Sequence, residues 1–469
     1  MSDFGVRHRD AALESGDASP QSKWRPYPKY KDSGVEWVGE IPEHWEWLRL
    51  RNACKRITDG SHHSPPAAID GRPYVTVSDL VDGRVDVDNA ARVSESDFRS
   101  LEQNGCRPHT GDVLFSKDGT VGKVALVERD DFVVLSSLAI LQPGPSLLSH
   151  FLFQFLSSAP GVSQIESKFA GAALRRITLD VIVDLVATIP PVEEQRAIAA
   201  FLDRETAKID ALIAKKERLI ELLQEKRKAL ITQAVIKGLD PNVPLKDSGV
   251  EWLGKIPAHW DLLPLKRCVL PKADSIKTGP FGSQLLAADM QGEDVKVYNQ
   301  RTVIDRDFSK GDVFITRRKF QELKSFEIYP GDVLVTTRGT IGQCAIVPAD
   351  SDQAILHPCL MRIQPDPTQM IREFITLLIQ ESYLVKTQLA LASNATTIDV
   401  IYSDTMSQVL VPKPPLHEQD SIVKWIDERT AEIDRLDKTV AEAIDRLKEY
   451  RTALISAAVT GKIDVRISN

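Results

Sequence analysis

The sequence predicts an α+β protein, with two domains of mixed α/β structure separated by two long helices that form an antiparallel intramolecular coiled coil. Three observations lead to this prediction. The chain contains an internal repeat, each copy ends in a long segment with almost no proline or glycine, and each copy holds short β-type runs between Gly, Asp and Pro turns. At roughly 150 residues per domain, the 469 residues suggest about three domains.

The repeat consists of three boxes that occur twice in the same order. The boxes and their second copies are Lys31–Trp45 and Lys246–Trp260, Gly111–Gly122 and Gly331–Gly342, and Pro190–Gln195 and Pro414–Gln419. The offset drifts slowly, from 215 (246 − 31) through 220 (331 − 111) to 224 (414 − 190). The chain is therefore interpreted as a tandem duplication. Its diverged stretches, about 51–175 and 266–396, are where the two copies should differ in what they bind.

Each copy ends in a segment with the apolar spacing of one long helix, the first from Pro191 to about Lys237. The apolar positions are Ile198, Leu202, Ile209, Leu212, Leu219, Leu223 and Leu230 in the first copy, and Ile422, Ile426, Ile433, Leu436, Val440, Leu447 and Leu454 in the second. Since neither stripe is stable in water, the helices are expected to pack on each other, with the first leaving the paired region at Ala234. The alternative, that each helix caps its own domain, fits poorly with a length of roughly 68 Å for about 45 residues.

The diverged stretches combine β-type runs with apolar helices. The runs are 72–77, 112–115, 132–135 and 332–335, and the helices are expected near 147–156 and 370–391. Each stretch is therefore predicted to be a compact domain with a mostly antiparallel or mixed sheet.

Composition narrows the class of protein. A hydrophobic content of 42 %, a charged content of 27 % and the lack of a long apolar run argue against a membrane span. The first residues, to about Trp24, lack the apolar core of a secretory signal and are predicted to be a loose tail. The five cysteines form no C-x-x-C pair, and His62-His63 lacks a third spaced ligand, so no metal site and no disulfide framework are expected. A cytoplasmic location is expected.

Taken together, the three boxes resemble those of the specificity subunits of type I restriction-modification enzymes, and they cover nearly all of the chain after the first 25 residues. The resemblance implies target-recognition domains that each read one half of a bipartite asymmetric DNA site, joined by two conserved helices that pair as a spacer. It divides the chain into a flexible N-terminal tail (1–25), a first target-recognition domain (26–190), a first spacer helix (191–240), a second target-recognition domain (241–413) and a second spacer helix (414–469).

The resemblance also implies partners that carry the chemistry. Two modification subunits would clamp the DNA and methylate adenine with S-adenosylmethionine, and a restriction subunit with an ATP-driven motor would complete the nuclease. This chain has no G-x-x-x-x-G-K-[ST] loop and no Asn-Pro-Pro-Tyr or Asp-Pro-Pro-Tyr box. It is therefore predicted to be non-catalytic and to bind no cofactor itself, with S-adenosylmethionine, ATP and Mg expected on the partner subunits.

Two loop segments are the first candidates for contact with double-stranded DNA. Their glycines let a backbone approach a phosphate closely, and their polar side chains supply hydrogen-bond donors. The candidates are Thr58, Asp59, Gly60, Ser61, His62 and His63 in the first copy, and Lys277, Thr278, Gly279, Phe281, Ser283 and Gln284 in the second. A plain turn is the alternative interpretation of each segment.

The turns after the two Gly-Asp-Val-Leu motifs are the second set of candidates. They carry Ser116, Lys117 and Thr120 in the first copy, and Thr336, Thr337, Arg338 and Thr340 in the second. Asp118 and Arg338 stand at matching positions, an exchange that fits two loops with different targets and fits surface drift equally well.

Basic clusters are the third set, for phosphate contact or for bidentate readout of guanine. They are Arg175 and Arg176, and Arg317, Arg318 and Lys319. A solvated charged face is the alternative for each cluster, and the net charge of −7 gives no support from overall charge.

Three other functions stay open at the level of sequence. The first is a recognition subunit that serves only a methyltransferase, which neighbouring genes would reveal. The second is a structural coiled-coil adaptor without DNA contact. The third is a nuclease with a degenerate P-D…[DE]-x-K motif, which cleavage of a plasmid with magnesium would reveal. The bases of the target do not follow from the sequence, because readout depends on loop conformation and DNA shape.

Overall fold

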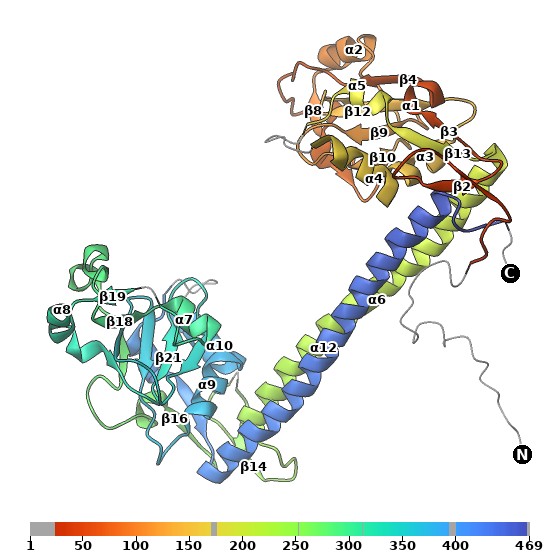
Figure 1. Cartoon of the computed structure of the whole chain (residues 1–469). Helices are drawn as coiled ribbons and strands as arrows, with labels where there is room; N and C mark the ends of the chain where they lie inside the picture. The colour runs from red at the N-terminus through yellow and green to blue at the C-terminus, as the bar shows by residue number, and fades with distance from the viewer. Residues whose placement is uncertain (1–23, 170–175, 252, 312, 394–399, 467–469) are drawn as a thin grey trace, which may run out of the picture. The chain divides into compact units, whose positions relative to one another are not determined.

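The computed structural model describes residues 24–169, 176–251, 253–311, 313–393 and 400–466, so the predicted tail falls almost entirely outside the described residues. The chain forms two compact units (Figure 1). Unit 1 comprises Met1–Glu217 and Ala441–Asn469, and unit 2 comprises Arg218–Val440. The long helices α6 (Val192–Lys237) and α12 (Leu416–Val459) each contribute residues to both units.

Unit 1 is built on a four-stranded antiparallel sheet with the strand order β10-β9-β12-β4. A three-stranded sheet, β11-β5-β8, contains one parallel pair, β11 with β5. The strands of unit 1 are β1 (Tyr30–Asp32), β2 (Glu40–Pro42), β3 (Glu46–Arg49), β4 (Cys54–Asp59), β5 (Arg72–Val75), β6 (Leu80–Val81), β7 (Arg84–Val85), β8 (Ala91–Val93), β9 (Val113–Ser116), β10 (Val124–Leu126), β11 (Val133–Val134), β12 (Leu138–Pro143) and β13 (Val186–Ile189).

Unit 2 repeats the arrangement of the main sheet. Its order, β17-β24-β21-β22, matches β4-β12-β9-β10 strand for strand, and β18 pairs in parallel with β23 as β5 pairs with β11. The strands of unit 2 are β14 (Leu245–Asp247), β15 (Lys255–Pro257), β16 (Asp261–Pro264), β17 (Ile276–Thr278), β18 (Val295–Tyr298), β19 (Phe314–Ile315), β20 (Glu327–Ile328), β21 (Val333–Thr336), β22 (Cys344–Ile346), β23 (Ala354–Leu356), β24 (Leu360–Ile363) and β25 (Leu410–Lys413). The predicted α+β class is therefore confirmed, and the sheets are mostly antiparallel.

Shorter helices accompany the sheets, including helices at the predicted segments 147–156 and 370–391. They are α1 (Leu50–Ala53), α2 (Glu95–Gln103), α3 (Ser149–Leu156), α4 (Ala159–Glu166) and α5 (Leu179–Val183) in unit 1, and α7 (Gln300–Asp305), α8 (Arg317–Glu322), α9 (Arg372–Gln380), α10 (Tyr383–Ser393) and α11 (Ser403–Gln408) in unit 2. The segment 370–391, predicted as one helical stretch, forms α9 and α10 with a break at Glu381 and Ser382.

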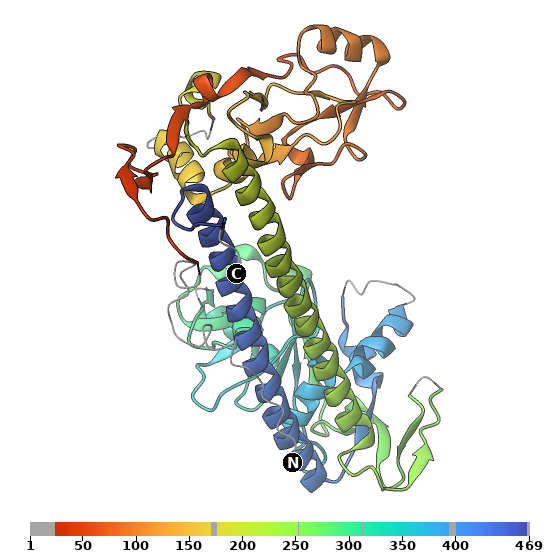
Figure 2. The same cartoon turned by 90° about the vertical axis from the view of Figure 1, so that its right-hand side faces the viewer.

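Within each unit, α6 and α12 lie side by side in both views (Figures 1 and 2). In unit 2 they run in opposite directions, since Gln224 contacts Asp437 while Arg227, further along α6, lies near Asp434, further back on α12. The predicted apolar stripe is wrong at Leu212, Leu219 and Leu436, which are 43 %, 43 % and 47 % exposed.

The neighbouring Ile213 is buried in place of Leu212. At 3.6 residues per turn, steps of seven drift around the helix, so a stripe drawn with such steps leaves the buried face. At Ala234, where the sequence predicts that the first helix leaves the paired region, α6 packs into the core of unit 2. Ala234, Val235 and Ile236 belong to the core of unit 2, where they are buried in one cluster with Trp260 and Ile422.

The first and third boxes of each repeat meet in one cluster at the start of each long helix. Glu194 on α6 accepts hydrogen bonds from Trp45 Nε1 (2.9 Å) and lies 2.8 Å from His44 Nε2. Glu418 on α12 makes the same contacts with Trp260 Nε1 (2.8 Å) and His259 Nε2 (2.7 Å). The boxes therefore recur because they anchor each long helix to the sheet domain before it in the chain.

The glutamine that follows each of these glutamates is buried and ties a second helix to the same point. Gln195 Oε1 accepts the Leu148 N–H at the start of α3 (2.8 Å), and Gln419 Oε1 accepts the Ile371 N–H at the start of α9 (2.9 Å). Because the first N–H groups of a helix lack partners within the helix, each glutamine satisfies a donor that burial would otherwise leave unpaired.

Candidate functional site

The two predicted loop sets lie at the same end of the main sheet in each unit. Lys117, at the turn after β9, donates its N–H to Ser137 O, and Gly60, after β4, donates to Leu138 O, so both flank the start of β12. In unit 2, Thr337 N–H donates to Cys359 O and Gly279 N–H to Leu360 O at the start of β24. The structure therefore brings together segments that are about 60 residues apart in the sequence.

The packing of the neighbouring backbone requires glycine at two positions of these loops. A Cβ atom on Gly60 would lie 2.1 Å from Val134 O, and one on Gly279 would lie 2.2 Å from His357 O. The close approach seen here is to a neighbouring backbone, and contact of these glycines with a phosphate stays a prediction.

An ion pair joins the two loops in unit 1. Lys117 Nζ lies 2.6 Å from Asp59 Oδ2, and the two side chains are only 5 % and 17 % exposed. His62 Nε2 lies 3.2 Å from the same carboxylate oxygen. The Lys117 ammonium is thus engaged within the protein, so in this conformation it is not presented for contact with DNA.

Unit 2 has two threonines where unit 1 has this ion pair. Register in the two sheets makes Thr278 the counterpart of Asp59 and Thr337 the counterpart of Lys117. Both threonine side chains are buried, and their hydroxyls have no hydrogen-bond partner among the described residues. The same scaffold therefore holds a charged pair in one unit and a neutral pair in the other.

A second pair of equivalent positions differs in charge. In each unit the turn bridges to a segment further along the chain, Asp118 to Arg176 in unit 1 and Arg338 to Val400 in unit 2. Arg176 Nε lies 3.0 Å from Asp118 Oδ1, so unit 1 neutralises this charge. In unit 2, the Arg338 guanidinium lies 5.7 Å from the ring centroid of Phe281.

Several other candidates have structural partners. Ser116 donates to Thr120 O (2.6 Å) and Thr336 donates to Thr340 O, so these hydroxyls close the two turns. Ser61 is buried and donates to His63 O (2.5 Å). Thr58 is half-buried, and the exposed side chains among these loops are His62, His63, Thr120, Ser283, Gln284, Arg338, Thr340 and, in part, Phe281.

The basic candidates are mostly engaged as well. Lys277 pairs with Asp274 (2.8 Å), Lys319 with Asp289 (3.4 Å), and Arg317 donates to Gln353 (2.9 Å). Arg318 is almost fully exposed and lies 3.5 Å from Glu322. Arg175 falls outside the described residues.

Two glutamines position Arg338 and Phe281, and the sequence pattern points to only one of them, Gln284. Gln300 Nε2 donates to Arg338 O (3.1 Å), and Gln284, a candidate for contact with DNA, instead accepts the Phe281 N–H through Oε1 (3.0 Å). No motif marks Gln300, because it lies in a diverged stretch and acts through a backbone carbonyl.

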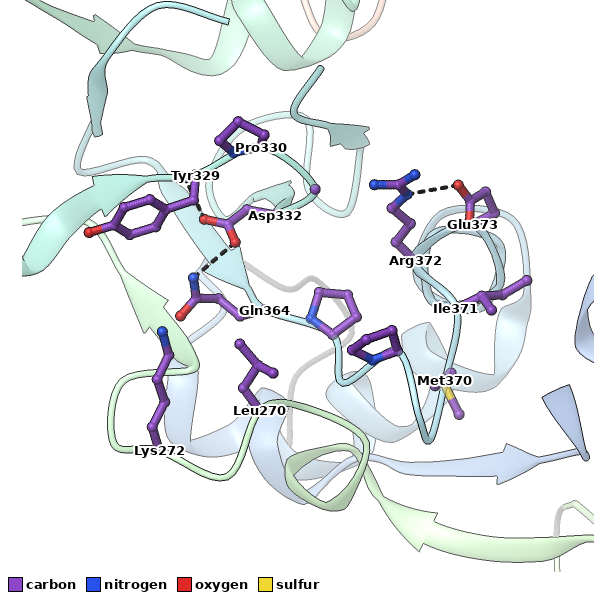
Figure 3. A pocket seen from close by; sticks show the side chains of 13 residues that line it. Leu270, Lys272, Tyr329, Pro330, Asp332, Gln364, Met370, Ile371, Arg372 and Glu373 are labelled. Carbon is purple, nitrogen blue, oxygen red and sulfur yellow. Dashed lines mark hydrogen bonds and ion pairs between the residues drawn. The ribbon is translucent and has the colours of Figure 1, made fainter. Parts of the chain in front are cut away.

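A pocket of about 650 Å³ lies in unit 2, away from these loops (Figure 3). Asp332 in its wall accepts from Gln364 Nε2 (2.9 Å) and Tyr329 N (2.8 Å), while burial raises the pKa of this aspartate. Arg372 pairs with Glu373 at 2.9 Å. Because Asp332 precedes β21 and the turn with Arg338 follows it, the pocket belongs to the other end of that strand.

None of the helices in the described part of the chain is long and apolar enough to cross a membrane. Among the same residues, the side chains of His, Cys, Asp and Glu form no group of three that could hold a metal ion.

Comparison with known proteins places the chain in a family. The family described as "Type I restriction modification DNA specificity domain" matches residues 65–222 and 285–446. The MjaVIII specificity subunit of Methanocaldococcus jannaschii is 23 % identical over 442 residues, covering 92 % of this chain and 95 % of that protein. The EcoBI specificity subunit of Escherichia coli is 21 % identical over 444 residues, covering 91 % and 88 %.

Solved structures share the fold. The HsdS subunit of Thermoanaerobacter tengcongensis has a TM-score of 0.51 at 18 % identity, covering 90 % of this chain and 98 % of that one. A chain from a study of complex assembly and conformational transition in a type I R-M system has a TM-score of 0.65 at 18 % identity, covering 89 % and 98 %. From its two matched segments and its relatives, the chain belongs to the type I restriction-modification DNA specificity family, as a specificity subunit.

Proposed function

We propose that each unit reads one half of a bipartite, asymmetric DNA site. One observation carries this proposal: equivalent loops, at the same end of equivalent sheets, hold different side chains in the two units. Asp118 in unit 1 stands where unit 2 has Arg338, and His62 stands where unit 2 has Phe281. Because base edges are recognised by the donors and acceptors that meet them, one scaffold with two side-chain sets suits two different half-sites.

The long helices are proposed to form one antiparallel coiled coil that sets the spacing of the half-sites and binds the modification subunits. Burial of Ile213 on α6 and Ile444 on α12 supports a packed seam. Leu212 and Leu436, which are related by the offset of the third box (436 − 212 = 224), remain exposed on the two helices. Two equivalent apolar positions provide like surfaces for two identical partner subunits.

The chemistry is proposed to belong to the partners. The chain would recognise DNA while two modification subunits methylate adenine with S-adenosylmethionine and a restriction subunit uses ATP and Mg for translocation and cleavage. The loops of this chain supply side chains suited to reading, such as Arg338 and His62, and the sequence holds no box for a methyl donor or a nucleotide. Cells that lack the restriction subunit would still modify their DNA.

The test is to express the full chain with its modification subunits in a host that lacks other adenine methylation, and to sequence the methylated DNA. The expected result is one split motif with two different halves and a fixed spacer. The purified chain alone should neither transfer methyl groups nor cleave DNA. Methylation without any sequence preference, or methyl transfer by the chain alone, would refute the proposal.

A further inference from the structure

We propose that Arg338, supported by Phe281, is a base-reading residue of unit 2, and that unit 1 has no counterpart to it. The inference rests on the proposed function, because it assumes that the loops of unit 2 meet DNA. It adds the residue, the type of base edge and the half-site that are involved. The base class is guanine, whose O6 and N7 acceptors suit the two parallel donors of a guanidinium.

The backbone of Arg338 is held in place on two sides. Gln300 Nε2 donates to Arg338 O at 3.1 Å, and the Arg338 backbone bridges to Val400. The preceding Thr337 donates its N–H to Cys359 O at 2.9 Å. The side chain therefore starts from a fixed point, which lowers the conformational entropy that binding must remove.

The ring of Phe281 contacts the guanidinium of Arg338. Its centroid lies 5.7 Å from the Arg338 guanidinium, within the range of a cation–π contact. The backbone that carries the ring is held, since the Phe281 N–H donates to Gln284 Oε1 at 3.0 Å. A planar group packed on an aromatic face keeps its N–H edge free, and this is the geometry that bidentate readout needs.

The charge of Arg338 is also free within the protein, unlike the charges of several other basic side chains of unit 2. Lys277 pairs with Asp274, Lys319 pairs with Asp289, and Arg362 is buried. No carboxylate among the described residues forms an ion pair with Arg338, and its side chain is exposed. An exposed arginine with its donors unused and its position fixed is prepared for an external acceptor.

Unit 1 differs at both positions of this pair. Asp118 stands in the place of Arg338 and is neutralised by Arg176 at 3.0 Å. Counting from the equivalent glycines Gly60 and Gly279, His62 stands in the place of Phe281. Substitution of Arg338 should therefore change only one half of the motif.

The experiment compares the motifs methylated by the full complex with wild-type chain and with Arg338→Ala, Arg338→Lys and Phe281→Leu. Arg372→Ala is the matched control, because Arg372 is an exposed arginine of the same unit at the other end of β21. Arg338→Ala should abolish the preference at one base pair of one half-site and slow methylation of wild-type sites about tenfold to a hundredfold. Arg338→Lys should do the same, because lysine keeps the charge and loses the fork.

Phe281→Leu should relax the same base pair to a lesser degree, and Arg372→Ala should leave the motif unchanged. An unchanged motif with Arg338→Ala overturns this inference alone. A uniform loss of methylation with an unchanged motif would indicate that Arg338 contacts a phosphate. Full function of Arg338→Lys would indicate the same, and either result overturns the inference that Arg338 reads a base. A wild-type complex without sequence preference overturns the proposed function, and this inference with it.

Discussion

Asp210 on α6 and Arg451 on α12 form an ion pair in unit 1, with 2.8 Å between Oδ1 and Nε. Unit 2 contains the same pair with the helices exchanged, since Arg227 on α6 lies 3.8 Å from Asp434 on α12. Asp434 follows Asp210, and Arg451 follows Arg227, by the offset of the third box (434 − 210 = 451 − 227 = 224). The two units thus contain one helix–helix contact twice, which is the relationship found in a two-fold symmetric dimer.

A fragment that ends near Asp240 is therefore expected to form a homodimer. In such a dimer, α6 of one copy takes the place of α12, and Asp210 of one copy meets Arg227 of the other. With modification subunits, the dimer should direct methylation to an inverted repeat of the first half-site. Sedimentation analysis of the fragment and sequencing of the methylated DNA give the two readouts.

Charge reversal provides the control for this dimer. Asp210→Arg should weaken dimerisation a few-fold, since exposed pairs contribute only about 0.2–1 kcal/mol each. The double variant Asp210→Arg with Arg227→Asp should restore it, because the pair is then reformed in the reverse sense. A fragment that is monomeric and inactive at all concentrations would count against the symmetric interface.

The buried pair of Asp59 and Lys117 predicts a large loss of stability when only one partner is removed. Lys117→Thr leaves the largely buried Asp59 carboxylate with His62 nearby but without its lysine, and breaking a buried pair costs as much as about 3–5 kcal/mol. The combined change Asp59→Thr with Lys117→Thr copies the arrangement of unit 2 and should recover most of the loss. Thermal unfolding of the two variants and the wild type measures the difference.

Equal destabilisation by Lys117→Thr and by the double variant would contradict this account. It would mean that the loss comes from the lysine side chain itself, whose methylene groups are also buried, and not from the unpaired charge of Asp59. A third variant, Lys117→Met, separates the two, because methionine keeps the apolar volume and removes the charge.

The sequence predicted the strands and helices well and the site only in part, and the loops show why. Box positions such as Gln195 and Glu194 stood out because their contacts require one residue type in both copies. The pairing of Asp59 with Lys117 joins residues 58 positions apart (117 − 59), and nothing in their local patterns links them. The sequence therefore predicts contact with DNA for Lys117, although the fold gives its ammonium a partner.

Glu194 makes the stability of unit 1 sensitive to acid. Burial opposes its ionisation, but hydrogen bonds from Trp45 and His44 and the charge of Arg466 outweigh burial and hold the pKa of Glu194 below its ordinary value. A carboxylate with a lowered folded-state pKa stabilises the fold above the ordinary glutamate range and loses that contribution as the pH falls through the folded-state value.

Glu194→Gln should therefore lower the melting temperature at pH 7 and reduce its decline below about pH 4. Glu193→Gln is the matched control, because the Glu193 side chain is 81 % exposed one position away. Parallel melting curves of the wild type and Glu194→Gln across this acid range would show that the carboxylate does not act as described.

The proposed role of the helices as a spacer predicts the effect of lengthening them. The insertion point suggested by the sequence, after Ala234, is unsuitable because Ala234 is buried in the core of unit 2. Four residues inserted between Glu217 and Arg218, together with four between Val440 and Ala441, lengthen both helices where the two units divide. The two insertions have the same length and lie at the two boundaries between the units. Within each unit, the residues of α6 therefore stay opposite the same residues of α12 as before.

Each insertion adds about 6 Å and about 40° beyond a full turn, at 1.5 Å and 3.6 residues per turn. A DNA base pair adds about 3.4 Å and roughly 34°, taking a helical turn as about 34–36 Å and 10–10.5 base pairs. The rotation therefore matches one base pair and the rise nearly two, so the variant should methylate the same half-sites separated by one or two additional unspecified pairs.

A single insertion in α6 is the control, because it shifts α6 against α12 in one unit and should abolish methylation. Sequencing of the methylated DNA decides the matter: an unchanged spacer at retained activity means that the helices do not set the distance, and altered half-site bases mean that the insertion has disturbed the recognition loops instead.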